Sequence, residues 1–241
     1  MKLAFCTQSK LHPLLLEAIG LIKKRINALS DLQSLSFDPK LSEIHSKFNK
    51  EELFIINEFY HAKGFRKIHL EVAKLGKSFQ VLHCVFFPDP RYELPIFGTD
   101  LVFNSNNISA AIVDLSPVGK LLPTQLISQM DLLPIPKFKE PRILPEWGYI
   151  FSPYVCFIRP VDFYEEKSFL MLIDQYLSLL LSLSLNVRED EINSLDSVSR
   201  FEYQKKYCLN QKQNDKTRIV LSKFFGSSWA EEYIEKILFS C

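Results

Sequence analysis

Three ionisable side chains, Glu71, His83 and Asp100, stand within apolar runs in the middle of the sequence. An isolated carboxylate among apolar neighbours is costly, so we expect Asp100 to need a partner, a proton or a ligand. A histidine and two acids whose pKa values are shifted by their surroundings are suited to delivering protons to a substrate in a dry cavity. We therefore predict Glu71, His83 and Asp100 as catalytic residues.

Each of these residues also has a purely structural explanation. A lone buried histidine is usually a bonded core residue, and an aspartate near a strand end often caps a turn. Glu71 could simply point to solvent. Three such groups on neighbouring strands of one sheet are harder to explain in this way, which favours a shared site.

The residues that must position these groups form a predicted antiparallel meander over 65–117. Its short runs are rich in Val, Ile and Phe and are broken at Gly76, at 88–90 and at 104–107. Side chains alternate between the two faces of a strand, so His69 and Glu71 are expected to share one face.

Helical patterns flank this meander. Apolar residues recur at helical spacing over 11–29 and 169–181, and further helices are predicted over about 190–210 and up to Leu238. Gly226 is expected to end a helix, and 228–231 has the spacing of a capping box. A proline-rich connection over 119–147 precedes a further predicted strand over 149–159. The pattern predicts an α/β fold, a three-layer α/β/α sandwich with a central antiparallel sheet.

Composition indicates one large soluble domain over residues 1–241. The chain has 47% hydrophobic residues and a net charge of +1, which gives no indication of a nucleic-acid or membrane partner. The five cysteines include no C-x-x-C pair, so neither a metal site nor an iron–sulfur cluster is indicated. The N-terminus lacks an apolar signal core, and we predict a cytoplasmic monomer.

Five segments resemble the ferredoxin-dependent bilin reductases. They are HLEVAKLGK, LHCVFFPDPRYELPIFGTDLV, ISAAIVDLSP, LPEWGYIFSPYVCFIRP and YCLNQKQNDKTRIVLSKFFGSSWAEEYIEKILF, and the likeness extends over about two thirds of the chain. Within the family the chain looks most like the members that convert biliverdin IXα to phycocyanobilin. The resemblance implies the same sandwich architecture.

That resemblance also implies a reaction and roles for the three candidates. The reaction is a four-electron reduction of biliverdin IXα through bilin radicals, at the D-ring vinyl group first and at the A-ring second. By this likeness Asp100 protonates the bilin, His83 shares that proton, and Glu71 delivers a proton to the D-ring vinyl group. His69 could complete a proton path to solvent.

Binding residues follow from the same resemblance. Lys216 and Arg142 match the positions that hold the two bilin propionates, and Asn214, Gln211 and Ser109 are expected as neutral hydrogen-bond partners. The other explanation for these residues is ordinary polarity of loops and helix ends.

The resemblance implies an acidic [2Fe-2S] ferredoxin as the partner. The sequence has no motif for a bound electron carrier, so no bound cofactor is expected and the electrons must come from a separate protein. Residues 200–223 hold seven basic and two acidic side chains, which indicates a docking surface or a solvated helix face. Three alternatives stay open at this point: a reductase that yields phycoerythrobilin or 15,16-dihydrobiliverdin, a non-catalytic bilin carrier, or a structural interaction module.

Overall fold

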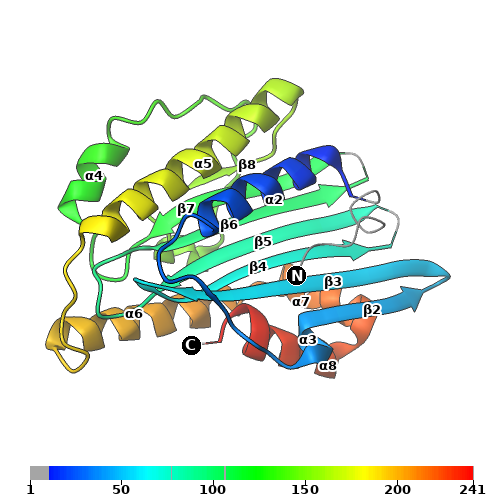
Figure 1. Cartoon of the computed structure of the whole chain (residues 1–241). Helices are drawn as coiled ribbons and strands as arrows, with labels where there is room; N and C mark the ends of the chain where they lie inside the picture. Colours follow the sequence, from blue (N-terminus) through cyan, green and yellow to red (C-terminus); the bar gives the residue numbers. More distant parts are fainter. Residues whose placement is uncertain (1–10, 77, 106, 241) are drawn as a thin grey trace.

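A computed structural model describes residues 11–76, 78–105 and 107–240 and contains one antiparallel sheet between two helical layers (Figure 1). The strand order is β1-β3-β4-β5-β6-β7-β8, with β2 also paired to β3. The strands are β1 (Gln33–Ser34), β2 (Glu43–Phe48), β3 (Glu51–Ala62), β4 (Phe65–Leu75), β5 (Phe79–Pro88), β6 (Ile96–Asn104), β7 (Asn107–Ser116) and β8 (Cys156–Ile158). The predicted α/β architecture and the meander over 65–117 are confirmed.

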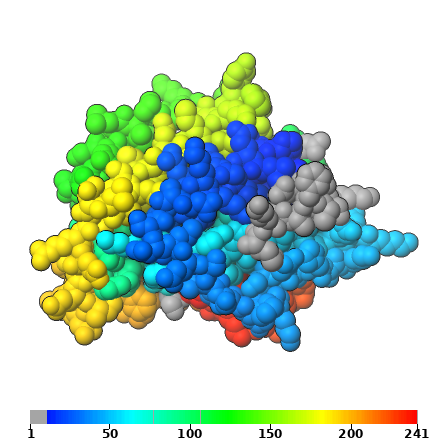
Figure 2. Space-filling view, in the orientation of Figure 1, coloured from blue at the N-terminus to red at the C-terminus, as the bar shows by residue number. Residues whose placement is uncertain are grey.

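Helices α2 (Pro13–Ile26) and α5 (Phe163–Asn186) cover one face of the sheet, with the short α4 (Thr124–Met130) beside them (Figure 1). Figure 2 shows α2 in blue lying alongside α5 in yellow and green across this face. A bidentate pair between Arg25 and Asp174, with N–O distances of 2.7 Å, joins the two helices. Apolar side chains from alternate positions of β4 to β7 fill the space beneath them.

The helix α5 is long and apolar enough to cross a membrane by length and composition alone. Its buried side chains, among them Phe169, Ile173 and Tyr176, pack on the sheet. This packing accounts for its apolar character without a membrane.

The C-terminal helices cover the opposite face (Figure 1). They are α6 (Leu195–Gln211), α7 (Asp215–Phe225), α8 (Ser227–Tyr233) and a π-helical turn η2 (Ile234–Leu238). Their apolar side chains pack against the other set of alternating strand residues, including Ala73, Val85 and Phe87. The face that carries Glu71 and His83 is therefore the one beneath these helices.

Three local predictions differ from the structure. The strand predicted over 149–159 is only three residues long, because η1 (Glu146–Ile150) and a bend occupy its first half. The capping box at 228–231 is wrong: α8 begins at Ser227 after Gly226, which has φ 89° and ends α7. The stretch through Pro39, whose serine and aspartate residues predict a loop, contains β1. The short helix α3 (Pro39–Ser42) and β2, an exposed edge strand stabilised by pairing with β3, follow it.

Candidate active site

The three predicted catalytic residues lie directly opposite one another on adjacent strands. Glu71 on β4 pairs with His83 on β5, and His83 pairs with Asp100 on β6. Asn57 on β3 continues the row, because it is the partner of Glu71. Paired residues of antiparallel strands point to the same face with Cβ atoms about 5 Å apart. We call Asn57, Glu71, His83 and Asp100 the polar ladder.

At one end of the polar ladder, His83 and Asp100 form a short hydrogen bond. His83 Nδ1 lies 2.6 Å from Asp100 Oδ1. The side chain of His83 is 12% exposed and that of Asp100 is 43% exposed, so Asp100 reaches toward solvent. The prediction that Asp100 lies in a dry cavity is therefore not met in this structure. We call His83 and Asp100 the open end.

At the other end, the polar side chains are enclosed beneath α8. Tyr233 donates its hydroxyl proton to Glu71 Oε2 at 2.6 Å, and His69 Nε2 lies 2.7 Å from Asn57 Oδ1. Glu71 is 6% exposed and His69 is fully buried. Glu71 thus does not point to solvent. We call Asn57, His69, Glu71 and Tyr233 the closed end.

Burial and charge shift the titration of this face in different directions. Burial raises the pKa of Glu71, although His83 and Tyr233 oppose that shift. Burial lowers the pKa of His83, but its interaction with Asp100 outweighs burial, and the net pKa of His83 is raised. Burial lowers the pKa of His69 well below its usual value, with further lowering by His83 and Lys67. At neutral pH His69 is therefore an uncharged imidazole, whereas Asp100 favours the protonated form of His83 relative to an exposed histidine.

Two imidazole nitrogens on this face have no hydrogen-bond partner among the described residues. They are His83 Nε2 and His69 Nδ1, and the two rings meet edge to face with centroids 5.4 Å apart. A buried polar atom without a partner is costly unless a water or ligand bonds to it. A water or ligand bonded to either nitrogen would therefore stabilise this face of the sheet.

Lys67 is a buried cation on the same face of β4. Its Nζ donates to the Ile237 carbonyl at 2.8 Å and to Ser240 Oγ at 2.7 Å. Burial lowers the pKa of Lys67 to about 7, with a smaller contribution from Arg66. Lys67 therefore holds the end of the chain against the sheet beside His69.

Tyr207 of α6 lies over β6 next to the open end. Its hydroxyl oxygen accepts from Gln211 Nε2 at 2.9 Å, and it is so close to Gly98 that a Cβ at that position would lie 3.1 Å away. Burial raises the pKa of Tyr207, and the charge of Asp100 raises it further. Gln211, a predicted binding residue, therefore orients a phenol beside Asp100.

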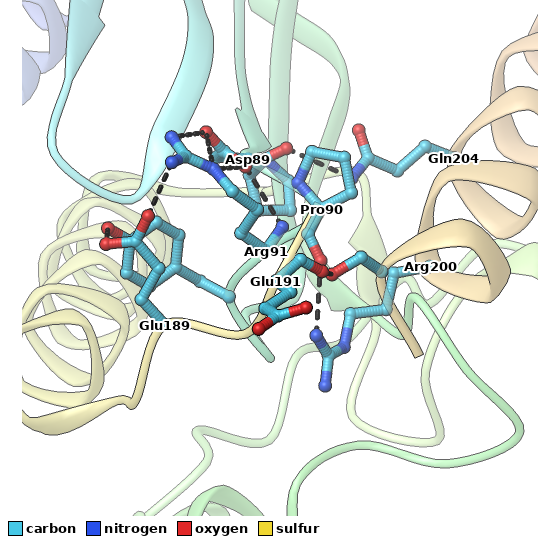
Figure 3. A network of polar contacts seen from close by, with 10 residues as sticks. Asp89, Pro90, Arg91, Glu189, Glu191, Arg200 and Gln204 are labelled. Carbon is cyan, nitrogen blue, oxygen red and sulfur yellow. Dashed lines mark hydrogen bonds and ion pairs between the residues drawn. The ribbon is translucent and has the colours of Figure 1, made fainter. Parts of the chain in front are cut away.

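A polar network at the end of β5 fixes α6 in this position (Figure 3). Arg200 donates to the Pro90 carbonyl at 3.1 Å and to Asp190 at 2.8 Å, and Gln204 donates to the Pro88 carbonyl at 3.0 Å. Since Gln204 and Tyr207 are less than one helical turn apart, anchoring Gln204 also sets where Tyr207 meets the sheet.

A pocket of about 220 Å³ adjoins this network and lies away from the polar ladder. It is lined by Asp31, Gln33, His61, Ala62, Lys63, Gly64, Asp89, Arg91, Tyr92 and Glu189. Arg91 in its wall is held by Asp89 at 2.7 Å and by Glu189 (Figure 3). None of the predicted site residues borders it.

The remaining predicted binding residues occupy three separate segments. Ser109 lies on β7 and donates to the Val102 carbonyl at 3.0 Å, and Arg142 is exposed in the connection before β8. Asn214 caps α7 by accepting from the Lys216 amide at 3.2 Å, and the Lys216 side chain is exposed in the first turn of that helix. The capping bond matches the structural explanation for Asn214. The binding roles of these residues stay predictions.

Sequence reasoning missed Asn57, Tyr233, Lys67 and Tyr207. Asn57 carried a usable signal, because it is an amide inside the apolar run LFIINEFY. Lys67 lies two and four residues before His69 and Glu71, which places it on their face. The two tyrosines are ordinary members of helical patterns, and only the tertiary structure brings their hydroxyls to the sheet. Within the described residues, no group of three or more His, Cys, Asp or Glu side chains is placed to hold a metal ion.

Comparison with known proteins gives consistent matches over most of the chain. Residues 20–240 match the model of the family described as ferredoxin-dependent bilin reductase. A protein of Prochlorococcus marinus strain MIT 9313 named phycocyanobilin:ferredoxin oxidoreductase is 48% identical over 229 residues, which cover 95% of this chain and 87% of that protein. A protein of the same name from Synechococcus sp. strain CC9902 is 45% identical over 230 residues, which cover 95% of this chain and 94% of that protein.

A solved structure supports the fold. Phytochromobilin synthase from tomato, in complex with biliverdin, matches with a TM-score of 0.70 and 20% identity, over 94% of this chain and 81% of the tomato chain. At this identity the match concerns the fold.

Proposed function

Because this chain belongs to the ferredoxin-dependent bilin reductase family, we propose that it reduces biliverdin IXα to phycocyanobilin. Relatives that are 45% and 48% identical and cover nearly the whole chain carry the name of that activity. The proposal depends mainly on one observation: Glu71, His83 and Asp100 are paired directly opposite one another on three adjacent strands. A reduction that takes up one proton for each electron requires such a set of proton donors.

The electrons come from reduced ferredoxin, one at a time, as the family's dependence on ferredoxin implies. A [2Fe-2S] ferredoxin with an acidic surface would fit the basic residues on and just after α6, such as Lys205, Lys206 and Lys212. Lys212 and Arg218 already pair with Glu235 and Glu231, so part of this charge is neutralised within the chain. The exposed Lys216 is the stronger candidate for contact with an anionic group.

The open end has the properties needed to protonate a bilin. Asp100 is accessible to a ligand, and the 2.6 Å bond to His83 lets the pair share and replace one proton. We assign protonation of the bilin to this pair. Bilin propionates would bind Lys216 and Arg142, with Gln211, Asn214 and Ser109 as neutral partners.

At the closed end, Glu71 is suited to holding a proton for later transfer. Burial raises the pKa of Glu71, so its carboxyl group holds a proton under conditions in which an exposed glutamate would be ionised. We assign to Glu71 the proton that reaches the D-ring vinyl group. We further propose that the protein acts as a cytoplasmic monomer.

The test is an anaerobic reaction of the purified protein with biliverdin, a [2Fe-2S] ferredoxin and a reducing system. We expect phycocyanobilin, at a rate that falls as salt screens the docking of ferredoxin. Phycoerythrobilin or 15,16-dihydrobiliverdin as the final product would overturn the proposed reaction. Biliverdin that binds but is never reduced would identify a carrier instead.

A further inference from the structure

Asn57 is the branching point of the hydrogen bonds at the closed end. Its Nδ2 donates to the Leu41 carbonyl at 2.7 Å and to the Tyr233 hydroxyl at 2.8 Å. Its Oδ1 lies 2.7 Å from His69 Nε2. With 6% of its surface exposed, Asn57 has little access to water as an alternative partner.

The Leu41 carbonyl fixes which way the Asn57 amide points. A backbone carbonyl can only accept, so the atom 2.7 Å from it must be the Nδ2 donor. Rotating the amide by half a turn would set two acceptor oxygens against each other in a buried place, which is strongly unfavourable. Leu41 lies in α3, outside the sheet, yet it orients a side chain within the polar ladder.

The amide orientation in turn fixes the tautomer of His69. Because Asn57 Oδ1 is an acceptor, His69 Nε2 must carry the proton of that bond. The neutral ring then has a lone pair at Nδ1, the atom that has no partner among the described residues. The ring of His69 therefore buries this lone pair while it packs edge to face with the ring of His83.

The same orientation directs the hydroxyl of Tyr233 toward Glu71. The oxygen of Tyr233 accepts from Asn57 Nδ2, and its single proton can go to Glu71 Oε2 at 2.6 Å or to Asn57 Oδ1 at 3.0 Å. The shorter contact to the carboxyl group is the stronger one. With Oε2 occupied as an acceptor, a proton on Glu71 resides on Oε1.

We infer that Asn57 and Tyr233 are positioning residues: they place the proton of Glu71 on Oε1 and hold His69 as the Nε2–H tautomer. Neither residue needs to touch the substrate for this purpose. They act on the reaction through Glu71 and His69, so their effect on catalysis rests on the proposed reduction. Their effect on the protonation of Glu71 and on the tautomer of His69 is independent of that reaction.

Several charged or titratable groups face Glu71 from the neighbouring elements. They are His69 and Lys67 on β4, His83 on β5, Asp100 on β6 and Tyr233 on α8. The hydroxyl of Tyr233 is the one of these that bonds directly to Glu71 in this structure. Removing the hydroxyl of Tyr233 therefore tests whether Tyr233 donates to Glu71 or accepts from it.

The decisive variant is Tyr233→Phe, studied without bilin by infrared titration of the Glu71 carboxyl band, which is assigned by its loss in Glu71→Gln. If Tyr233 donates to Glu71, removing the hydroxyl withdraws a donor from the ionised form, and the pKa of Glu71 rises. If the bond runs the other way, the protonated form loses its acceptor and the pKa of Glu71 falls. A fall or no change overturns the inference.

Tyr203→Phe is the matched control. Tyr203 is partly buried and packs against the same helical layer, and its hydroxyl has no hydrogen bond described in the structure. This variant should leave the Glu71 band unchanged. If Tyr233→Phe does not fold, nitrogen NMR of histidine-labelled wild-type protein decides: His69 should be the neutral Nε2–H tautomer, and an Nδ1–H tautomer refutes the inference.

The catalytic readout separates the inference from the proposed function. In Tyr233→Phe we expect kcat to fall about tenfold, the factor for one lost hydrogen bond, while KM for biliverdin is unchanged. Because the D-ring vinyl group is reduced first, biliverdin itself should persist longer than with the wild-type protein. If the wild-type protein does not turn over biliverdin, the proposed reaction is rejected, but the titration of Glu71 still tests the inference. If the pKa of Glu71 rises in Tyr233→Phe and kcat does not change, Tyr233 has only a structural role.

Discussion

The closed and open ends of the polar ladder are built on the same sheet face but satisfy their polar atoms differently. At the closed end Glu71 bonds to Tyr233 and His69 bonds to Asn57, and the enclosing residues come from α3 and α8. At the open end Asp100 has one partner, His83, among the described residues, and 43% of its side chain is exposed. The open end is therefore where a ligand can reach a polar side chain of the ladder.

This difference separates two tasks that a proton-coupled reduction requires. A proton held for a specific atom has to be enclosed, because water would otherwise exchange it. A group that protonates and releases an incoming substrate has to be accessible and replenished. The sheet provides both because the C-terminal helices cover Glu71 on β4 more completely than Asp100 on β6.

The largest expected effect comes from Asp100→Asn at the open end. Replacing the carboxyl group removes the acid while keeping the shape of the side chain, so biliverdin should still bind. The rate of reduction should fall by about 100-fold or more, as is typical for loss of a general acid. Anaerobic turnover with ferredoxin, together with a binding titration of biliverdin, measures both quantities.

The matched control is Asp196→Asn, which neutralises an exposed acid in the first turn of α6. This variant should retain wild-type turnover. Equal rates for Asp100→Asn and wild type would mean that the open end does not supply the proton.

A smaller effect is expected on the pH dependence of the free energy of unfolding, to which His83 and His69 contribute with opposite signs. The pKa of His83 is raised because Asp100 outweighs burial, so His83 stabilises the fold below the unfolded-state pKa of about 6.5, and this stability is lost as pH rises through its folded-state pKa. Burial lowers the pKa of His69, so the unfolded chain takes up a proton that the folded state excludes. His69 therefore removes stability as pH falls below about 6.5.

Urea unfolding between pH 8 and pH 5 measures this contrast. On acidification His83→Gln should lose more stability than wild type, and His69→Gln should lose less, by up to about 1.4 kcal/mol per pH unit in each case. The same slope for His83→Gln and His69→Gln would contradict the distinction between the two ends.

Much of the fold could be predicted because the buried strands carry a strong pattern. The runs around Ile68, Leu82 and Leu101 alternate or are continuously apolar, and they became β4, β5 and β6 as expected. The edge strand β2 was missed because its side chains are mostly exposed and polar, so pairing with β3, rather than its own pattern, determines its conformation. The capping box failed because Gly226 serves both α7 and α8.

The candidate site was predictable on the strands and not on the helices. A period of two puts His69 with Glu71 on one face, and the apolar runs around His83 and Asp100 marked these two as ionisable groups within strands. The degree of enclosure was not predictable, because it depends on where α6 and α8 meet the sheet. For the same reason no sequence pattern distinguished Tyr233 and Tyr207 from other helical aromatics, although their hydroxyls lie at the two ends of the ladder.

Protonation of the bilin by Asp100 is the central claim, and an absorption titration tests it directly. Biliverdin bound to wild-type protein should show the spectrum of the protonated chromophore near neutral pH, and biliverdin bound to Asp100→Asn should show that of the neutral chromophore. A neutral chromophore in wild type, or the same protonated spectrum in both proteins, would contradict this role of Asp100.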